Sequence, residues 1–543
     1  DCPSHQAVPT VGCPAMGISI AGVKIRTRAA VSGVSAGKTK VDSEKFISRV
    51  SVCISAVVSP PSVRRVSATR VLASSAGWQQ VKMSRSLSSG ISGAGSSRAA
   101  ASASASSRRS GARAARRAAR RQRREVLGQV RQVVGLVVES SGPPAKIGDL
   151  CFIETLSGRI ESEVVGFRGD RVLLMPLGEL EGIQAGCTVR AAGHVLRMPV
   201  GRGLLGRAVN GLGHPIDGLG PLDASGTYPV TAAPPNALER QMIQRPFMTG
   251  VRAIDGSLTM GVGQRMGIFA GSGVGKSTLL GMIARNGGAD VNVIALVGER
   301  GREVREFMEN DLGPEGLARS IVVCATSDEP ALLRIKAALA ATALAESFRD
   351  QGLNVMLMMD SVTRFAMAQR EVGLAVGEPP STKGYTPSVF ALLPRLMERA
   401  GCGPSGAITA IYTVLVDGDD TNEPIADAAR SILDGHIVLN RKLTSRGHYP
   451  PIDVMQSLSR VMPMVTTAEH VRRANALREL VAAYRDVEDL VNIGAYKPGA
   501  NPLADRAIGR WDQIQGFLRQ DRAEIADPTS TLQALEEIVD EAV

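Results

Sequence analysis

The chain has 543 residues, 44% of them hydrophobic, so it is long enough for several domains and apolar enough to build substantial cores. Seven cysteines are too few for a disulfide framework, and no run approaches the roughly 18 apolar residues of a membrane-spanning helix. The net charge is +11, but residues 1–124 carry 22 Lys and Arg against three acids, and the remainder is net −8. The basicity therefore does not indicate nucleic-acid binding by the body of the protein.

Residues 1–124 form a basic leader, which is dominated by Ser, Ala, Gly and Arg from residue 86 onward. We expect disorder there, because so few apolar residues cannot offset the entropy lost on ordering. The composition also matches an organellar transit peptide, and residues 113–124 could form a basic amphipathic helix that meets anionic lipid or an acidic partner. The chain begins at Asp1, and translation of GC-rich upstream DNA gives the same bias toward Gly, Ala, Ser and Arg. We therefore interpret the leader as an incidental or misassigned segment, with a targeting signal and a binding segment as the alternatives.

Residues 125–200 contain short β-branched segments separated by turn signals. The expected strands are 133–139, 150–155, 159–167 and 171–176. This spacing predicts a small all-β unit, a closed barrel that ends near Pro199. Its aromatic residues are only Phe152 and Phe167, so a base-stacking surface for oligonucleotides is poorly supported.

From residue 201 to residue 460, apolar strands alternate with helical patterns, which is typical of a parallel sheet covered by helices. The expected strands are 265–270, 291–297, 320–326, 354–360 and 407–416. An Ala- and Leu-rich stretch at 330–348 predicts a helix, with Ser327 and Asp328 as candidate caps. Strand signals fade afterwards, and residues 461–543 are expected to form a helical domain.

A glycine-rich segment between the strand 265–270 and the next helix predicts a phosphate-binding loop. Its candidate nucleotide-binding residues are Gly271, Ser272, Gly273, Val274, Gly275, Lys276, Ser277 and Thr278. Backbone N–H groups of such a loop surround phosphate oxygens, and the helix N-terminus adds partial positive charge. Lys276 would reach the β- and γ-phosphates, and the Ser277 hydroxyl would bind Mg²⁺. The alternative is a glycine-rich turn with a solvated lysine.

Two acidic residues follow expected strands, where the carboxyl ends of parallel strands converge on a ligand crevice. Glu299 comes two residues after the end of the strand 291–297 and is our candidate to polarise an attacking water. Asp360 ends the strand 354–360 and would hold the water shell of Mg²⁺, as a Walker-B aspartate does, with Arg364 near the phosphates. The alternatives are a solvated charged face and a structural aspartate.

One further arginine is a candidate to complete the site. Arg460 ends the segment YPPIDVMQSLSR and would neutralise charge that develops in the transition state. Spacing alone does not select it among 63 Lys and Arg, so a surface salt bridge is the interpretation from the residues. The six His and seven Cys show no paired ligand spacing, so we expect no metal site built from them.

Several motifs together resemble the catalytic subunits of rotary ATP synthases and their export relatives. The segments that carry this resemblance are AGSGVGKST, GERGREV, DSVTRFAMAQREVGLAVGEPPSTKGYTPSVF and PPIDVMQSLS. With GDDTNEPIADAARSILDGHIVL and NIGAYKPGANPLADRAI, the chain looks most like the flagellum-specific export ATPases, and the virulence type III secretion ATPases are a close second. The resemblance covers the chain from about residue 130 to the C-terminus.

The resemblance implies an α/β fold with a RecA-like P-loop core, an N-terminal small β-barrel and a C-terminal helical domain. It also implies a homohexameric ring with ATP and Mg²⁺ at each subunit interface. The implied phosphate and metal groups are Lys276, Ser277, Glu303 and Asp360. The implied remaining roles are Glu299 as general base, Arg300 and Arg364 at the γ-phosphate, Tyr449 against adenine, and Arg460 as the finger that a neighbouring subunit donates.

The function implied by the resemblance is an ATP-hydrolysing motor of the flagellar type III export apparatus. Its implied partners are export-gate and regulatory or stator proteins, export substrates and chaperones, at the cytoplasmic face of the inner membrane. An RNA-translocating hexamer is an alternative that would need barrel aromatics and a basic pore. Another alternative is a non-catalytic ring subunit. The presence of Lys276, Glu299 and Asp360 in one chain counts against it.

Overall fold

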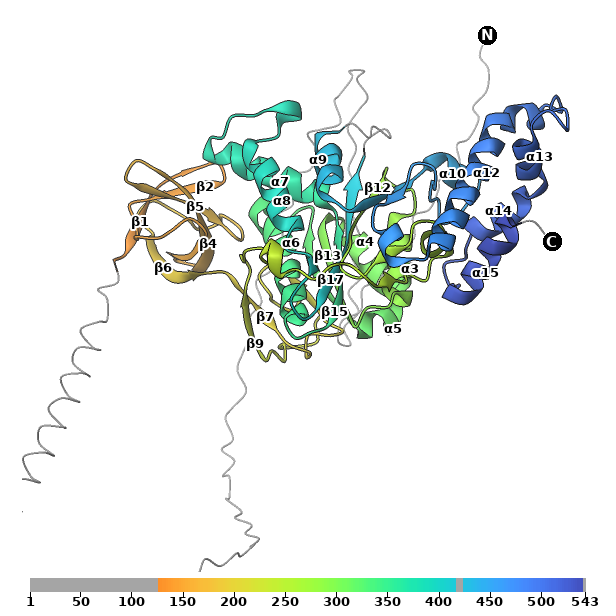
Figure 1. The fold of residues 1–543 in the computed structure, drawn as a ribbon. Coiled ribbons are helices and arrows are strands. Elements are labelled where there is room, and N and C mark those ends of the chain that lie inside the picture. The colour runs from red at the N-terminus through yellow and green to blue at the C-terminus, as the bar shows by residue number, and fades with distance from the viewer. Residues whose placement is uncertain (1–125, 417–422, 541–543) are drawn as a thin grey trace, which may run out of the picture. The chain divides into compact units, whose positions relative to one another are not determined.

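The computed structural model describes residues 126–416 and 423–540, so the predicted basic leader and part of the motif at 418–439 lie outside the described residues. A closed six-stranded barrel in the order β1-β2-β5-β4-β3-β6 comes first in these residues (Figure 1). Its strands are β1 Gly128–Val134, β2 Val137–Ser140, β3 Asp149–Thr155, β4 Gly158–Arg168, β5 Arg171–Pro176 and β6 Thr188–Val195. The predicted barrel is therefore present.

One predicted strand of the barrel, 133–139, is wrong. The chain reverses inside this segment, because β1 ends at Val134, β2 begins at Val137, and the two pair as an antiparallel hairpin. Gly135 in the turn has φ +56°, a left-handed conformation that glycine adopts without strain. The apolar run continues through the turn, so the hydrophobic pattern gave no sign of the reversal.

A nine-stranded, mostly parallel sheet forms the centre of the next part, with the path β19-β18-β12-β17-β15-β13-β14-β8 and β16 beside β17. Its strands are β8 Ala208–Asn210, β12 Arg265–Ala270, β13 Val291–Glu299, β14 Ser320–Thr326, β15 Asn354–Asp360, β16 Gly401–Cys402, β17 Ala407–Leu415, β18 Gly435–Leu439 and β19 Leu458–Ser459. All five strands predicted for this part are confirmed. β8 was missed because three residues are too few to show a period.

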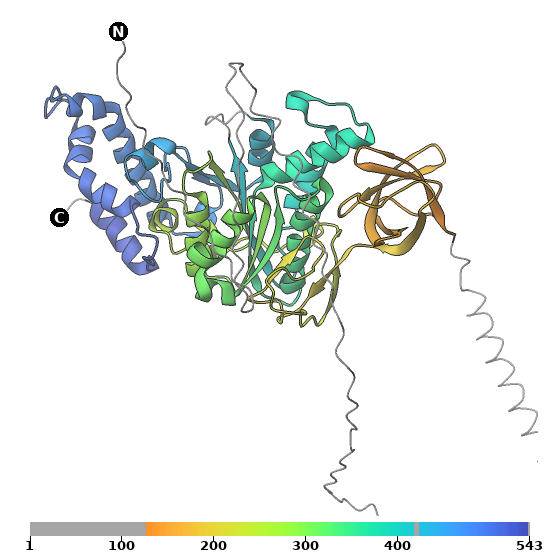
Figure 2. The ribbon, with the colours of Figure 1, turned by 180° about the vertical axis from the view of Figure 1, so that it is seen from behind.

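Helices cover both faces of this sheet (Figures 1 and 2). One face is covered by α6 Ala331–Arg349, α7 Val362–Val376, α8 Pro387–Met397 and α9 Pro424–Ile432. The other is covered by α2 Arg252–Ser257, α3 Lys276–Asn286, α4 Gly301–Glu306, the π-helical turn η2 Phe307–Leu312 and α5 Gly313–Ala318. Successive strand residues point to opposite faces, so Val293 and Ala295 pack in the first core and Ile294 in the second.

The predicted helix at 330–348 is α6, but its predicted caps are wrong. Pro330 is the N-cap residue, and no side chain caps the helix. Ser327 instead lies in the preceding turn, where its backbone N–H donates to the carbonyl of Glu299 over 3.0 Å. The turn after β14 is thereby tied to the end of β13.

The last part of the described chain is helical, as predicted. Its helices are α11 Met462–Val465, α12 Ala468–Asn492, α13 Pro502–Gly509, α14 Trp511–Leu518 and α15 Pro528–Val539, and the short helix α10 Arg441–Ser445 precedes them. The remaining short elements are β7 Arg197–Val200, β9 Gly226–Pro229, η1 Ala237–Glu239, β10 Pro246–Phe247, β11 Met260–Gly261 and η3 Thr382–Gly384.

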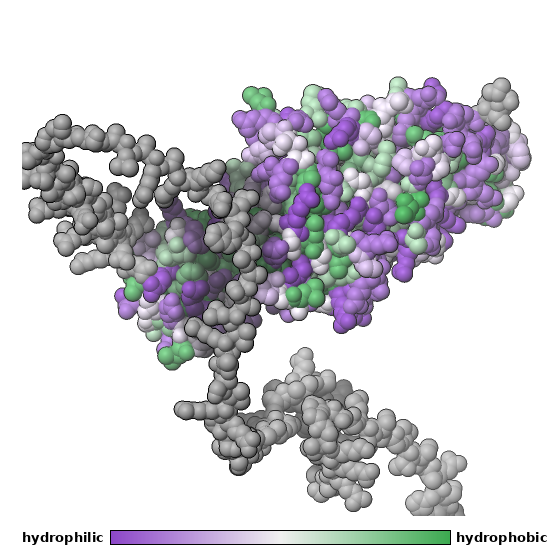
Figure 3. All heavy atoms as spheres, turned by 90° about the horizontal axis from the view of Figure 1, so that it is seen from below, coloured by the Kyte–Doolittle hydropathy of each residue, from purple (hydrophilic) through white to green (hydrophobic). Residues whose placement is uncertain are grey.

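Hydrophilic residues cover much of the face shown in Figure 3, with apolar residues between them. Within residues 126–416 and 423–540, no helix combines the length and the apolar character needed to cross a bilayer.

Candidate active site

The predicted phosphate-binding loop joins β12 to α3, and helix α3 begins at Lys276. Gly273 and Gly275 have φ of +74° and +99°, values that favour glycine. A Cβ on Gly273 would meet nothing within 4 Å, so glycine is required at this position by backbone conformation and not by crowding. The loop therefore presents its backbone N–H groups and the N-terminus of α3 as an anion-binding surface.

Helix α10 follows β18, the strand beside β12, and it supports this loop. Arg441 Nη2 donates to the carbonyl of Ser272 over 3.1 Å, and Thr444 Oγ1 donates to the carbonyl of Val274 over 3.4 Å. Neither residue was predicted, because the partners are about 170 positions apart and no local pattern links them.

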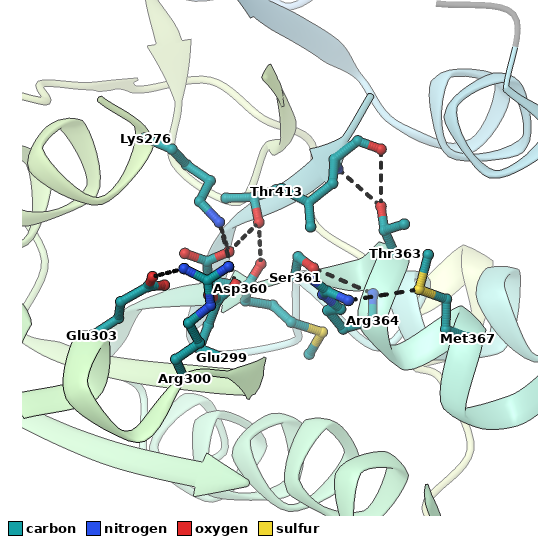
Figure 4. Close-up of polar contacts among 12 residues, drawn as sticks. Lys276, Glu299, Arg300, Glu303, Asp360, Ser361, Thr363, Arg364, Met367 and Thr413 are labelled. Carbon is teal, nitrogen blue, oxygen red and sulfur yellow. Dashed lines mark hydrogen bonds and ion pairs between the residues drawn. The ribbon is translucent and has the colours of Figure 1, made fainter. Parts of the chain in front are cut away.

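Lys276 extends from the loop to the two acidic residues predicted at the strand ends (Figure 4). Its Nζ lies 3.4 Å from Glu299 Oε1 and closer still to Asp360 Oδ1. Burial alone would lower the pKa of Lys276, but the carboxylates of Asp360 and Glu299 outweigh burial and raise the pKa. The ammonium group is therefore held as a cation between two acids.

Glu299 has a perturbed carboxyl group. Burial, followed by repulsion from the Asp360 carboxylate, raises the pKa of Glu299 to about 7, although Lys276 opposes the shift. The nearby carboxyl of Glu303 acts in the same direction as burial. A carboxyl group with a pKa near neutrality is suited to accept a proton from water at physiological pH.

Two predicted arginines flank these acids (Figure 4). Arg300 Nη1 donates to Glu303 Oε1 over 3.1 Å, and its side chain is 76% exposed. The stem of Arg364 packs on the backbone of Gly298, where an added Cβ would lie 2.9 Å from Arg364 Cβ. In the described part of the chain no acid forms an ion pair with Arg364, so its exposed guanidinium is available to an anion.

Tyr449 lies beside the phosphate-binding loop. One edge of its ring, at Cε1, is 4.0 Å from the position that a Cβ on Gly275 would take. Tyr449 and Thr278 line a cavity of about 650 Å³, together with Arg252, Arg519 and Gln520. This volume is within the range of small-ligand pockets. The family resemblance implied Tyr449, but no sequence signal indicated the cavity residues Arg519 and Gln520 from the C-terminal helical part.

Arg460 does not lie with the other predicted site residues. It follows β19, which pairs with the start of β18, and its backbone N–H donates to the Asp434 carbonyl over 3.1 Å. The start of β18 lies beside the start of β12, whereas the phosphate-binding loop follows the end of β12. Strands rise about 3.3 Å per residue, so roughly 17 Å of strand separates these two edges of the sheet.

The oxygen donors at the loop suit Mg²⁺, which prefers hydroxyl and carboxylate oxygen ligands. Ser277 is in the first turn of α3, and the Asp360 carboxylate ends β15. Asp360 Oδ1 accepts from both Lys276 and Thr413. Among the described residues, no group of three or more His, Cys, Asp or Glu could hold a metal ion. A metal at this site would therefore also need phosphate and water oxygens.

Three family models match consecutive parts of the chain. The ATP synthase alpha/beta family beta-barrel domain matches residues 130–193, and the nucleotide-binding domain of the same family matches residues 250–459. The T3SS EscN ATPase C-terminal domain matches residues 466–537. The matched ranges follow the order barrel, sheet and helical part.

Individual relatives match closely over most of their length. The flagellum-specific ATP synthase of Bacillus subtilis is 58% identical over 413 residues, which are 75% of this chain and 94% of that protein. The type 3 secretion system ATPase of Xanthomonas euvesicatoria is 51% identical, covering 76% and 94%. The assembled ATPase EscN from enteropathogenic E. coli superimposes with a TM-score of 0.73 at 48% identity, covering 76% of this chain and all of that one. The chain is therefore an ATPase of the ATP synthase alpha/beta family, in the branch that contains flagellum-specific ATP synthases and type 3 secretion system ATPases.

Proposed function

We propose that this ATPase is the motor of a flagellar type III protein export apparatus and that it hydrolyses ATP between identical subunits of a homohexamer. One observation carries the proposal. Lys276, Glu299 and Asp360 lie at the carboxyl edge of the sheet, and Arg460 lies at the amino edge. This separation supports a role for Arg460 at the site of an adjacent copy, because its backbone is anchored at the edge of the sheet opposite its own phosphate-binding loop.

In the proposed mechanism, the loop 271–278 binds the phosphates, and Lys276 moves from its two carboxylates to the β- and γ-phosphates. Ser277 and Asp360 would hold Mg²⁺, with Glu303 supporting its waters, and the bound ion would neutralise charge on the phosphate oxygens.

Glu299 accepts the proton of the attacking water in this mechanism, which its pKa of about 7 supports. Arg300 and Arg364 approach the γ-phosphate, and Tyr449 stacks on adenine. Arg460 from the adjacent subunit neutralises the charge that develops as the terminal phosphate is transferred.

The relatives support the assembly and its surroundings. EscN is described as assembled, and in a second structure as a complex with its central stalk EscO. We infer a homohexamer at the cytoplasmic face of the inner membrane, in contact with export-gate and regulatory or stator proteins. Export substrates and their chaperones would be its cargo. The higher identity to the Bacillus subtilis flagellar relative, 58% against 51% for the Xanthomonas protein, favours the flagellar system over virulence secretion.

Specific nucleic-acid binding is not part of the proposal. The barrel offers few aromatic faces for base stacking, and one of them is already covered, because the Arg159 guanidinium lies 3.9 Å from the Phe152 ring centroid.

The shared site can be tested by mixing two inactive variants, Lys276→Ala and Arg460→Ala. Each variant alone should hydrolyse ATP very slowly. In an equal mixture, about a quarter of the interfaces combine an intact Lys276 with an intact Arg460, so activity should return to about that fraction. No recovery in assemblies shown to contain both variants would refute a site shared between subunits.

Restored motility in a Bacillus subtilis strain that lacks its own flagellum-specific ATP synthase would support the flagellar assignment, and failure to restore it would count against that assignment.

A further inference from the structure

Thr413, near the carboxyl end of the inner strand β17, contacts the carboxylate of Asp360 (Figure 4). Its Oγ1 lies 2.8 Å from Asp360 Oδ1 and 3.3 Å from the Met359 carbonyl, and the side chain is fully buried. A threonine hydroxyl has one proton to donate, and the shorter contact, to a charged acceptor, is the stronger hydrogen bond. Thr413 therefore donates to the acid that the proposed function assigns to Mg²⁺.

This contact follows from the register of two parallel strands. Tyr412 of β17 pairs with Met359 of β15, which brings the next residues, Thr413 and Asp360, together at the carboxyl edge. The two residues are 53 positions apart in the chain. No local motif therefore indicates the contact, and Thr413 was absent from the candidate residues of the sequence analysis.

The backbone around Asp360 is held by other groups. The backbone N–H of Leu415 donates to Thr363 Oγ1 over 2.9 Å, which ties the end of β17 to the start of α7. Ser361 caps α7 by accepting from the Arg364 N–H over 3.2 Å. Loss of the Thr413 hydroxyl would leave these bonds in place, so its effect falls on the orientation of the Asp360 carboxyl group.

Lys276 also donates to Asp360 Oδ1. In the proposed mechanism, however, this lysine moves to the phosphates when nucleotide binds. After that movement, Thr413 is the remaining side-chain donor to Oδ1 within the described part of the chain. The other oxygen, Oδ2, is then the one offered to the hydrated metal.

We propose that Thr413 is a positioning residue for Mg²⁺: its hydroxyl fixes the Asp360 carboxyl group so that one oxygen stays bonded to the protein and the other faces the metal's water shell. The inference rests on the proposed role of Asp360 in holding Mg²⁺. Removal of a group that hydrogen-bonds to a metal-binding side chain usually lowers metal affinity or activity by about 10- to 100-fold.

The test is Thr413→Val, which replaces the hydroxyl by a methyl group of similar size. Binding of a fluorescent ADP analogue to the full chain would be followed while Mg²⁺ is titrated. The Mg²⁺ concentration for half-maximal binding should rise by about tenfold or more, whereas affinity in EDTA should match the wild type. Thr413→Ser restores the donor and should bring the midpoint back to within about threefold of the wild type.

Thr409 provides a matched control on the same strand. It is also buried, and its Oγ1 accepts from the Gly263 N–H over 2.9 Å, away from Asp360. Thr409→Val should lower the melting temperature about as much as Thr413→Val does, but it should leave the Mg²⁺ midpoint unchanged. An unchanged midpoint in Thr413→Val, or an equal shift in Thr409→Val, would overturn the proposal. If the wild type binds the analogue equally well with and without Mg²⁺, the metal site itself is wrong and Thr413 has no metal to position.

Discussion

Replacing Glu299 by Gln should end hydrolysis and at the same time stabilise the nucleotide-free protein above neutral pH. The pKa of Glu299 is about 7 in the folded protein, against 4.5 ordinarily, because of burial and the neighbouring Asp360 carboxylate. The folded state therefore holds this proton more tightly than the unfolded state does, and the free energy of unfolding falls as pH rises from about 4.5 to about 7. Glutamine has nearly the same shape and no charge, so the variant escapes this loss.

The size of the effect follows from the shift. Each pKa unit corresponds to about 1.4 kcal/mol, so a rise from 4.5 to about 7 destabilises the folded protein by about 3 kcal/mol once the pH exceeds 7. At about pH 5 the folded carboxyl group is still protonated, and less than about 1 kcal/mol of this loss is present. The advantage of Glu299→Gln should thus be large at pH 8 and small at pH 5.

Thermal unfolding of the nucleotide-free protein at both pH values measures this difference. About 3 kcal/mol in a domain of this size corresponds to a gain of roughly 6 to 12 °C in melting temperature near pH 8. Glu309→Gln is a suitable control, because that carboxylate is 60% exposed and pairs with an exposed Arg305, so it should change stability little. A Glu299→Gln variant no more stable than the wild type at pH 8, or equally stabilised at both pH values, would refute the reasoning.

Two further predictions concern the pH profile and the packing behind the loop. The kcat/KM of the wild type for ATP should rise with pH and level off above about 7, because Glu299 must be unprotonated to accept the water proton; a flat profile between about pH 5.5 and 9 in steady-state assays would contradict this. Gly281→Ala should lower the free energy of unfolding by about 1–3 kcal/mol, since the new Cβ would lie 2.6 Å from the Asp311 carbonyl of η2. Calorimetry should show the opposite sign for Gly516→Ala in α14, where nothing lies within 4 Å; equal losses in both would show that the close contact is not the cause.

Much of the fold was predictable from the sequence because its signals are local. The strands of the sheet are apolar runs bounded by polar turns, and β12 and β15 begin and end where the pattern placed them. The phosphate-binding loop was readable because its glycines, its lysine and its place between strand and helix are adjacent in the chain. The hairpin at Gly135 was not, because the apolar run continues through the turn.

The parts of the site that escaped prediction depend on strand order and register. The contact between Thr413 and Asp360 exists because β17 lies beside β15, and no pattern within either strand shows this pairing. The position of Arg460 at the far edge depends likewise on β18 lying beside β12. A motif can give the identity of an arginine, but only the assembled sheet shows which end of the molecule holds it.

Strand β18 links the residue that anchors Arg460 to the helix that supports the phosphate-binding loop. Before it stands Asp434, whose carbonyl accepts from the Arg460 backbone, and after it stands Arg441, which holds the Ser272 carbonyl. Between them lie the five residues of β18, four of which pair with β12, and Asn440. A paired strand of this length cannot lengthen, so the distance between its two ends is fixed. In the proposed ring, the residue that would serve one neighbour's nucleotide and the loop that would bind this subunit's own phosphates are thus joined through one short strand.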